Sequence, residues 1–361
     1  MSVELVSFTG DSGLADYAVS LAREMRKLTD VRVVTSDRTP AHFRQMGFEV
    51  LPTFRRSRHF PVDVWKFVAG VLKRRPRWVV LQGPLKWPLL DAVLVRVLRA
   101  CGIGVAITVH DVLPHYPGWL SRWTYAAYYR AGSKLITHSE AAKSALASMG
   151  VNRPTLVVPH GIYDLFRLTN LSREQARRLL GLPDDAHVCL FFGHLETRKG
   201  VQVLIEAAER LQGNRAHHFV IAGGRDANDG SDAYRDALSR AAKLSNVTLL
   251  DQRIPFEEVE RFFVAADAVA LPYLEGTTSG VLKLALAFGI PVIATPVGDF
   301  PEQVPEGGGV FIEQDGDVPA ALIRGLETLK GDPSYQRCMA NSRDLAQWSD
   351  IAARYLQFLQ Q

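Results

Sequence analysis

Short apolar runs alternate with amphipathic stretches along the chain, and this alternation limits the possible folds more than any other feature. Brief runs rich in Val, Ile and Leu are typical of strands buried on both faces. Strands that alternate with helices predict parallel sheets covered by helices on both sides. The expected strands are 3–8, 31–35, 78–81, 105–109, 134–137, 155–158, 187–192, 217–222, 247–250, 268–271, 291–294 and 309–311.

The expected strands fall into two sets, which indicates two domains of the same kind. A chain of 361 residues is long for one domain and sufficient for two. We therefore predict an α/β protein with two Rossmann-like parallel-sheet domains, residues 1–165 and 166–343. The stretch 344–361 has the apolar stripe of a helix, which we expect to return to the first domain. Its apolar positions are Leu345, Trp348, Ile351, Ala352, Tyr355, Leu356 and Leu359.

Charge is unevenly divided between the two halves. Residues 1–165 hold 22 Lys and Arg against 12 Asp and Glu, whereas residues 166–361 carry a net charge of −6. The basic residues concentrate between 55 and 77, where aromatic residues are interleaved with them. Two interpretations stay open: a solvated helix face with core aromatics, or a surface that rests on anionic lipid. Nucleic-acid binding is disfavoured, because no zinc spacing, aromatic RNA-binding pattern or recognition helix is present.

Three separated cysteines without metal-ligand spacing indicate a reducing compartment. The first residues lack the basic and apolar regions of a secretory signal. The best candidate for a membrane span, 87–109, contains Asp91, Arg96 and Arg99. We therefore expect a cytoplasmic protein, with the inner face of the cell membrane as its one alternative place.

The stretch 268–295 reads as strand, polar loop, helix and strand. The loop holds Glu275 and ends in Ser279 and Gly280, and Gly289 closes the helix expected over 281–288. Ligands of parallel sheets bind at the carboxyl ends of strands, and a helix start offers free backbone N–H groups to an anion. A carboxylate beside such donors suits a sugar joined to phosphate, which describes a nucleotide-sugar.

A second loop, 193–200, places Arg198 and Lys199 at the start of a helix, where the helix dipole disfavours positive charge. A bound diphosphate would relieve that repulsion. The alternative is a solvated basic loop, and we expect Glu196 to be a surface group.

His110 follows the strand 105–109 and is expected at a ligand-binding edge, whereas His115 and His160 are weaker candidates. Ser139 is expected to cap the helix that begins at 140. The glycine loop 10–13 permits a close approach of a ligand but is not a GxGxxG fingerprint, so a nicotinamide enzyme is disfavoured. The sequence also lacks HExxH, GxSxG and GxxxxGK[ST] motifs, which argues against such metalloproteases, hydrolases and kinases.

Taken together, these segments resemble a family 4 glycosyltransferase, a retaining enzyme with the GT-B fold. The resemblance spans nearly the whole chain and rests on the order and spacing of its motifs. They are the glycine loop at 10–13, THSEAAKSAL at 137–146, VVPHGIYDLF at 157–166, GHLETRKG at 193–200, IAGG at 221–224, IPFEEVERFFVAADAVALPY at 254–273 and SGVLKLALAFGIPVIATPVG at 279–298. The segment TVHDVLPH at 108–115 resembles sequences of the family branch that makes bacterial polysaccharides and glycolipids.

The resemblance implies roles for individual residues. Lys199 matches the family's diphosphate lysine, Glu275 the first acid of its paired-glutamate pattern, and His110 the histidine against the donor sugar. Gly13 matches the phosphate-loop glycine of the first domain. The donor-binding amides would come from Ser279, Gly280, Val281 and Leu282.

Two positions depart from the family pattern. The companion arginine usually stands earlier in its loop, where His194 and Glu196 stand here, so Arg198 is a substitute. The second acid, which ordinarily holds the nucleotide ribose, is replaced by Lys283. Lys283 either contacts a ribose or phosphate itself, or the nucleotide is gripped from elsewhere.

The resemblance implies a hexosyltransferase that uses a nucleotide-diphosphate-sugar and a glycan or polyprenyl-linked acceptor. It further implies a donor site between two closing domains, and neither a bound metal nor another cofactor. A catalytically weak nucleotide-sugar-binding protein and a sugar-nucleotide epimerase of the same fold stay open as alternatives.

Overall fold

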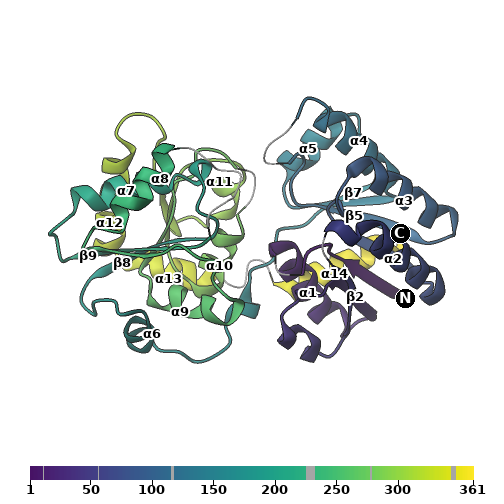
Figure 1. The fold of residues 1–361 in the computed structure, drawn as a ribbon, viewed down its shortest axis with the longest axis horizontal. Coiled ribbons are helices and arrows are strands. Elements are labelled where there is room, and N and C mark those ends of the chain that lie inside the picture. The colour runs from purple at the N-terminus through teal and green to yellow at the C-terminus, as the bar shows by residue number, and fades with distance from the viewer. Residues whose placement is uncertain (11, 56, 115–117, 225–231, 277–278, 343–346) are drawn as a thin grey trace. The chain divides into compact units, whose positions relative to one another are not determined.

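The computed structural model describes residues 1–361 except 11, 56, 115–117, 225–231, 277–278 and 343–346. The chain forms two compact units: unit 1 comprises Met1–Gly161 and Ala346–Gln361, and unit 2 comprises Ile162–Leu345. Each unit contains one parallel sheet with helices on its faces (Figure 1). The predicted pair of Rossmann-like α/β units is therefore confirmed.

The sheet of unit 1 has seven strands in the order β3-β2-β1-β4-β5-β6-β7. The strands are β1 Ser2–Val6, β2 Asp30–Ser36, β3 Glu49–Phe54, β4 Trp78–Gln82, β5 Gly104–Val109, β6 Lys134–Thr137 and β7 Thr155–Val157. Strand β3 is not among those expected from the sequence. This strand lies at the sheet edge, is largely accessible to solvent and contains Pro52, so it lacks the continuous apolar run of a buried strand.

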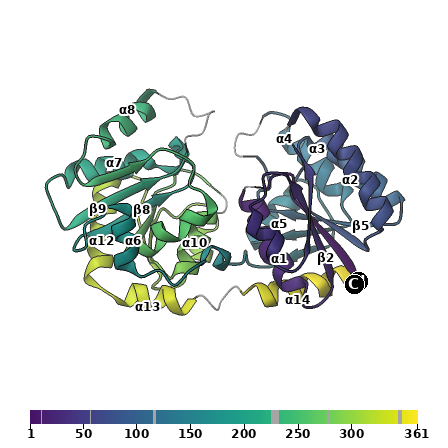
Figure 2. The same ribbon diagram turned by 60° about the horizontal axis from the view of Figure 1, so that its bottom comes forward.

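The helices of unit 1 are α1 Gly13–Met25, α2 Phe60–Arg74, α3 Pro88–Ala100, α4 Ser121–Ala131, α5 Glu140–Ser148 and α14 Trp348–Gln360. As predicted, α14 returns to this unit, where it packs against α1 (Figure 2). The Tyr17 and Tyr355 hydroxyls lie 2.8 Å apart, and Tyr355 is also 3.2 Å from the Thr108 hydroxyl. Ser139 caps α5 by accepting a hydrogen bond from the Ala142 amide, again as predicted.

The sheet of unit 2 has six strands in the order β10-β9-β8-β11-β12-β13. They are β8 His187–Phe192, β9 His217–Ala222, β10 Val247–Leu250, β11 Ala268–Leu271, β12 Val292–Ala294 and β13 Gly309–Phe311. The helices are α6 Arg173–Leu180, α7 Val201–Arg210, α8 Asp232–Ala241, α9 Val259–Ala265, α10 Gly280–Phe288, α11 Phe300–Gln303, α12 Val318–Gly331 and α13 Ser334–Asn341. Short 3-10 helices are η1 Ala41–Gln45, η2 Ser57–His59, η3 Asp164–Phe166, η4 Thr197–Lys199 and η5 Phe256–Glu258.

In both sheets the order of strands reverses beside the first strand of the unit. The reversal lies between β1 and β4 in unit 1 and between β8 and β11 in unit 2. Loops that leave two such neighbouring strands diverge to opposite faces of the sheet and leave a crevice for ligands. These two positions are therefore the first places to look for a site.

The aromatic residues between 54 and 78 divide between core and surface. Phe54, Phe60, Phe67 and Trp78 are buried, whereas the Trp65 side chain is 69% exposed. Of the two interpretations, the one with core aromatics therefore holds for most of these residues, and Trp65 is the exception. Among the helices of the described residues, none is long and apolar enough to cross a membrane.

One tight contact in unit 2 yields a stability prediction. Gly200 has a φ of +70°, and a Cβ there would lie 1.9 Å from the Pro272 carbonyl oxygen. Gly200→Ala is expected to lower the free energy of unfolding by about 3 kcal/mol or more, because the backbone must move.

Gly181 is the matched control, since its φ is +64° but nothing lies within 4 Å of a Cβ there. Gly181→Ala is expected to cost about 1 kcal/mol, from the left-handed backbone alone. Urea unfolding of both variants measures the difference, and equal losses would contradict the close approach to Pro272.

Candidate functional site

Two loops meet at the strand reversal of unit 2. One follows β8 and covers residues 193–199, and the other follows β11 and covers residues 272–279. Since β8 and β11 are neighbours, the loops touch: the Leu274 amide donates a hydrogen bond to the Arg198 carbonyl at 2.7 Å. The two segments predicted to bind diphosphate and sugar are thus brought together.

Glu196 is not a surface group, contrary to the sequence-based expectation. It is only 2% exposed, and Arg198 grips it with two hydrogen bonds, Nε to Oε2 at 2.8 Å and Nη2 to Oε1 at 2.9 Å. The Lys199 ammonium lies 3.4 Å from Oε1 of the same carboxylate. The sequence pattern suggested that an external anion balances the adjacent cations, but Glu196 supplies part of that balance from within the loop.

The two cations are held differently, and this bears on what each can bind. The Arg198 guanidinium forms a bidentate pair with the Glu196 carboxylate. The distance from Lys199 to Glu196 exceeds that of an ordinary hydrogen bond, so this contact is mainly electrostatic. Lys199 is 9% exposed, and its ammonium lies 5.9 Å from the centre of the Tyr273 ring. Lys199 is therefore the cation better placed to engage a ligand.

Glu275 is exposed, and the backbone just before it is fixed by two side chains from neighbouring segments. The Thr295 hydroxyl donates to the Tyr273 carbonyl at 2.5 Å. The Gln314 amide donates to the carbonyls of Tyr273 at 2.8 Å and Leu274 at 2.9 Å. The Glu275 carboxylate therefore extends from a turn whose preceding backbone is fixed by hydrogen bonds. Residues 277 and 278 of the same loop lie outside the described residues.

Ser279 forms the N-cap of α10 and already uses one of the predicted donor amides. Its hydroxyl accepts a hydrogen bond from the Leu282 amide at 3.3 Å and lies 3.1 Å from the Tyr273 hydroxyl. The geometry of a helix start leaves the amides of Gly280 and Val281 without intrahelical acceptors. Of the four predicted positions, these two are the better donors to an anion.

Lys283 is buried, at 2% exposure, and does not point into solvent. Its ammonium donates to the side-chain oxygen of Gln303 in α11. Burial lowers the pKa of Lys283 from 10.5 to about 8, and nearby Asp299 partly opposes the shift. The position that holds an acid in the family thus carries a buried cation whose charge changes near neutral pH.

In unit 1, the first loop and β5 place Gly13 and His110 at the carboxyl edge of the sheet. Gly13 is exposed at the first position of α1, after the N-cap Ser12. The His110 Nε2 lies 3.1 Å from the side-chain oxygen of Gln82, the last residue of β4. This contact orients the imidazole at the end of β5.

His110 belongs to a cluster of rings around Tyr17. The centroid of the Tyr17 ring lies 4.7 Å from that of His110, 5.2 Å from His138 and 4.9 Å from His160. Burial and the neighbouring His138 lower the pKa of His110 well below its ordinary value of 6.5. His110 is therefore neutral at physiological pH. His160 is buried in this cluster, and His115 lies outside the described residues.

Sequence reasoning missed several residues that shape these sites. Tyr273, Gln303 and Gln314 support the unit 2 loops, while Tyr17 and Gln82 orient His110. Single Tyr and Gln residues carry no motif, so no sequence signal marked them. Within the described part of the chain, no group of three or more His, Cys, Asp or Glu side chains is placed to hold a metal ion.

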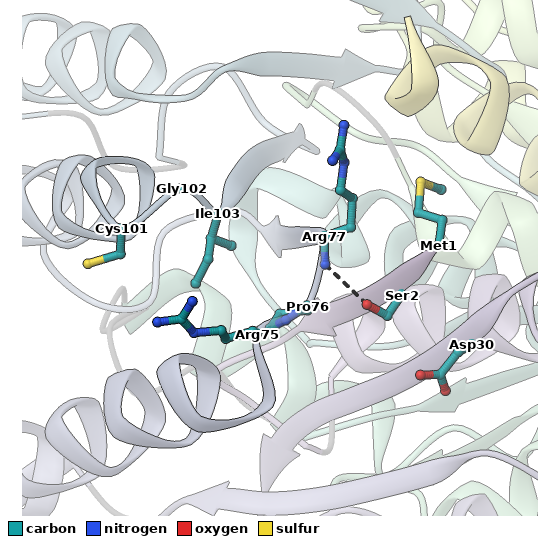
Figure 3. A pocket seen from close by; sticks show the side chains of 9 residues that line it. All are labelled: Met1, Ser2, Asp30, Arg75, Pro76, Arg77, Cys101, Gly102 and Ile103. Atoms are coloured by element: carbon teal, nitrogen blue, oxygen red, sulfur yellow. Dashed lines mark hydrogen bonds between the residues drawn. The ribbon is translucent and has the colours of Figure 1, made fainter.

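A hollow of about 550 Å³ lies elsewhere on unit 1 (Figure 3). It is found where β1, β2, β4 and β5 begin, at the edge of the sheet opposite His110. Its lining residues are Met1, Ser2, Asp30, Arg75, Pro76, Arg77, Cys101, Gly102 and Ile103. The Arg77 amide donates to the Ser2 hydroxyl at 3.1 Å across its wall. None of the predicted site residues lines this hollow, so we assign it no role in the site.

Comparison with known proteins supplies independent findings. Residues 12–164 match the model of the family described as "Glycosyltransferase Family 4", and residues 186–332 match that of "Glycosyl transferases group 1". The chain is 35% identical over 187 residues to a D-inositol 3-phosphate glycosyltransferase of Corynebacterium glutamicum, an alignment that covers 50% of this chain and 44% of that protein. The chain thus spans about half the length of the curated relatives it matches.

Solved structures share the fold at low sequence identity. Sucrose-phosphate synthase from Thermosynechococcus elongatus has a TM-score of 0.76 at 21% identity, covering 100% of this chain and 98% of that one. Anabaena Alr3699/HepE in complex with UDP and glucose has a TM-score of 0.74 at 17% identity, covering 100% and 97%. At such identities the likeness concerns the fold alone.

The buried position of Lys283 predicts a pH-dependent stability effect. Its folded-state pKa of about 8 lies below the ordinary 10.5, so holding it protonated in the fold costs stability below about pH 8. That cost vanishes as the pH rises from 8 towards 10.5. Lys283→Met is expected to stabilise the protein by up to about 3 kcal/mol at neutral pH, less the lost contact to Gln303, and by less at alkaline pH.

Urea unfolding at neutral and alkaline pH measures this effect, and Lys243→Met, at an exposed lysine of the same unit, is the control. A gain that does not change with pH would contradict a buried, cation-destabilised Lys283.

Proposed function

Since the chain belongs to glycosyltransferase family 4, we propose that it is a retaining hexosyltransferase acting on a nucleotide-diphosphate-sugar. The acceptor in this proposal is a glycan or a lipid-linked glycan of cell-surface polysaccharide or glycolipid synthesis. The observation that carries the proposal is the contact of the 193–199 and 272–279 loops, which joins Lys199 to the Glu275 turn. The complexes of Anabaena Alr3699/HepE with UDP and glucose support this class of donor.

In the proposed reaction, the bond between the anomeric carbon and the diphosphate oxygen breaks while an acceptor hydroxyl attacks on the same face of the sugar. Negative charge grows on the leaving diphosphate. Lys199 and the amides of Gly280 and Val281 would stabilise that charge, because preorganised donors act most strongly in a dry site. The departing phosphate oxygen takes the acceptor's proton, so the step needs no protein base and no metal cofactor.

Glu196 pairs closely with Arg198 and more loosely with Lys199, so the two cations have different roles in the proposed reaction. It keeps Arg198 in place through two short hydrogen bonds, so much of the guanidinium charge is compensated. Lys199 sits beside the same carboxylate but retains donors for a phosphate oxygen. We therefore assign the main electrostatic role to Lys199 and a supporting role to Arg198.

His110 and Glu275 would orient the donor sugar. A neutral imidazole oriented by Gln82 offers a ring nitrogen to a sugar hydroxyl, because one of its nitrogens donates and the other accepts. An exposed carboxylate such as Glu275 accepts hydrogen bonds from two hydroxyls. Because Lys283 is buried against Gln303, the nucleotide ribose must be held in another way than by the family's second acid.

A lipid-linked acceptor implies work at a membrane. The positive excess of residues 1–165 suits the anionic inner face of the cell membrane. This proposal therefore makes the protein a peripheral enzyme on the cytoplasmic side.

The Lys283 substitution also motivates a second candidate, a nucleotide-sugar-binding protein with little activity. A thermal-shift screen of nucleotide-sugars would identify the ligand, since a ligand of the folded state raises the melting temperature. Products of the best donor then separate the candidates: a longer glycan indicates transfer, a rearranged nucleotide-sugar indicates an epimerase, and binding without a product indicates the second candidate. Loss of the product in Glu275→Ala would tie the chemistry to this loop.

The first functional prediction concerns Lys199. Lys199→Ala is expected to lower kcat about 100- to 1000-fold, because the growing diphosphate charge loses its main partner. The variant should fold, since Arg198 still pairs with the buried Glu196 carboxylate. Steady-state turnover with the donor found in the screen measures the effect, and Lys243→Ala is the exposed control. Unchanged turnover in a folded Lys199→Ala protein would remove the lysine from the mechanism.

The second functional prediction concerns His110. Because burial keeps the pKa of this imidazole well below 6.5, the ring should stay neutral between about pH 6 and 8. His110→Gln, which keeps polar atoms, is expected to retain more turnover than His110→Ala. The pH profiles of the wild type and His110→Gln should have the same shape. An acidic limb near pH 6.5 in the wild type alone would show that His110 titrates during turnover.

A further inference from the structure

The helices α2, α3 and α4 lie on one side of unit 1 (Figure 2), and they and the residues just before them carry exposed large apolar side chains. We call this the α2–α4 surface. Its members are Val62, Trp65 and Leu72 of α2, Leu89, Leu90, Val93 and Val97 of α3, Trp123 of α4, and Trp87, Trp119 and Leu120 just before α3 and α4. The helices touch: α3 packs against α4, and the rings of Phe60 and Trp87 lie 5.1 Å apart.

The exposed apolar residues of α3 are regularly spaced along the helix. Leu90, Val93 and Val97 recur at helical spacing and form a stripe of their own, between 44% and 56% exposed. Leu94, Val95 and Leu98, on the adjoining side of the helix, are buried in the core of the unit. An ordinary surface helix is apolar on one face only. On α3 the apolar residues extend well beyond the buried side, which indicates that something covers the exposed stripe.

The tryptophans are displayed by ordered backbone. Trp119 is 92% exposed although its turn is fixed, since the Gly118 amide donates to the Ser121 hydroxyl and the Ser121 amide to the Gly118 carbonyl, each at 2.9 Å. Trp123, in the first turn of α4, is 59% exposed. Tryptophan side chains favour the interface between lipid headgroups and acyl chains, where the ring is buried and its N–H finds a polar partner.

These side chains lie near the ligand-binding edge of the unit 1 sheet. A helix that follows a parallel strand begins at the carboxyl end of that strand. Trp87, Trp119 and Trp123 belong to the first turns of α3 and α4 or precede them, so they flank the edge where β4 and β5 end in Gln82 and Val109. His110 directly follows Val109. A partner that covers the α2–α4 surface would therefore lie near His110.

The charge of this surface selects its partner. Within α2, α3 and α4 the acidic residues are Asp63 and Asp91, and both are 1% exposed. Asp63 is bound by Arg55, and Asp91 accepts a hydrogen bond from the Lys86 amide. The basic residues Arg58, Lys66, Lys73 and Arg96, by contrast, are exposed. An apolar surface with basic side chains and no exposed carboxylate on its helices complements anionic headgroups.

We propose that the α2–α4 surface seats unit 1 on an anionic lipid bilayer, with Trp119, Trp123 and Leu90 inserted into the interfacial region. A second copy of the chain fits less well, because two such surfaces would bring like charges together. The inference deepens the proposed function by naming the membrane-binding side chains. It assigns the main contribution to apolar insertion and a supporting one to positive charge.

The test is flotation of the full-length protein with vesicles of phosphatidylcholine alone and of phosphatidylcholine with phosphatidylglycerol. The wild type should bind the anionic vesicles, with a blue shift of tryptophan emission and quenching by lipids brominated near the headgroup. The variant Leu90→Ser/Trp119→Ser/Trp123→Ser should lose about tenfold or more in partitioning. Lys66→Ser/Arg96→Ser should lose less and mainly at low salt, since screening weakens the charged contribution.

Leu28→Ser/Leu179→Ser is the matched control, because these leucines are 60% and 63% exposed but lie outside the surface. Its partitioning should equal that of the wild type. Equal binding of the wild type and the triple variant, or no binding to anionic vesicles, would overturn the proposal. A wild-type dimer that the triple variant dissolves, seen by light scattering without lipid, would assign the surface to a second copy instead.

A separate measurement keeps this proposal distinct from the proposed function. Calorimetric affinity for the nucleotide-sugar in lipid-free buffer should be the same in the wild type and the triple variant, because none of the three substituted residues belongs to the donor loops. Intact donor affinity and turnover without vesicle binding would contradict the membrane-binding proposal and leave the proposed transferase activity standing. Vesicle binding without donor affinity would sink the transferase alone.

Discussion

The adjacency of β8 and β11 is the constraint from which the unit 2 site follows. The strand order reverses between them, so the loops that leave their carboxyl ends lie side by side although about 80 residues of sequence separate them. The hydrogen bond from the Leu274 amide to the Arg198 carbonyl and the packing of Gly200 on Pro272 lock these loops together. Lys199 and Tyr273 face one another because of this contact, and Glu275 follows two residues later.

Glu196 shows how the fold holds positive charge ready without a ligand. A buried carboxylate is costly unless it is paired, and Arg198 pairs with it through both oxygens. Lys199 joins the same carboxylate more loosely. Glu196 thus offsets the repulsion between two neighbouring cations at the start of α7. In the proposed function, this arrangement leaves Lys199 to bind the diphosphate.

Unit 1 combines an interior ring cluster with an apolar exterior. Tyr17 links His110, His138 and His160, and its hydroxyl reaches Tyr355 of α14, so the last helix of the chain helps to hold the imidazole that is proposed to face the sugar. The outer helices α2, α3 and α4 meanwhile expose tryptophan and leucine beside basic residues. In the proposed function, the ring cluster would contact the donor sugar and the α2–α4 surface would contact lipid.

The sequence by itself determined the parallel α/β architecture and the return of the last helix, because period, length and glycine positions encode local structure. It missed β3, an exposed edge strand with a proline, because solvent contact removes the apolar run on which recognition depends. It also misjudged Glu196, and it left open whether Phe54, Phe60, Phe67 and Trp78 are buried, since burial depends on what packs against a side chain and not on the residue type. The tertiary structure alone decided which cations pair with Glu196, that Lys283 points to Gln303, and which tryptophans stay outside, because those outcomes depend on contacts between strands and helices far apart in the chain.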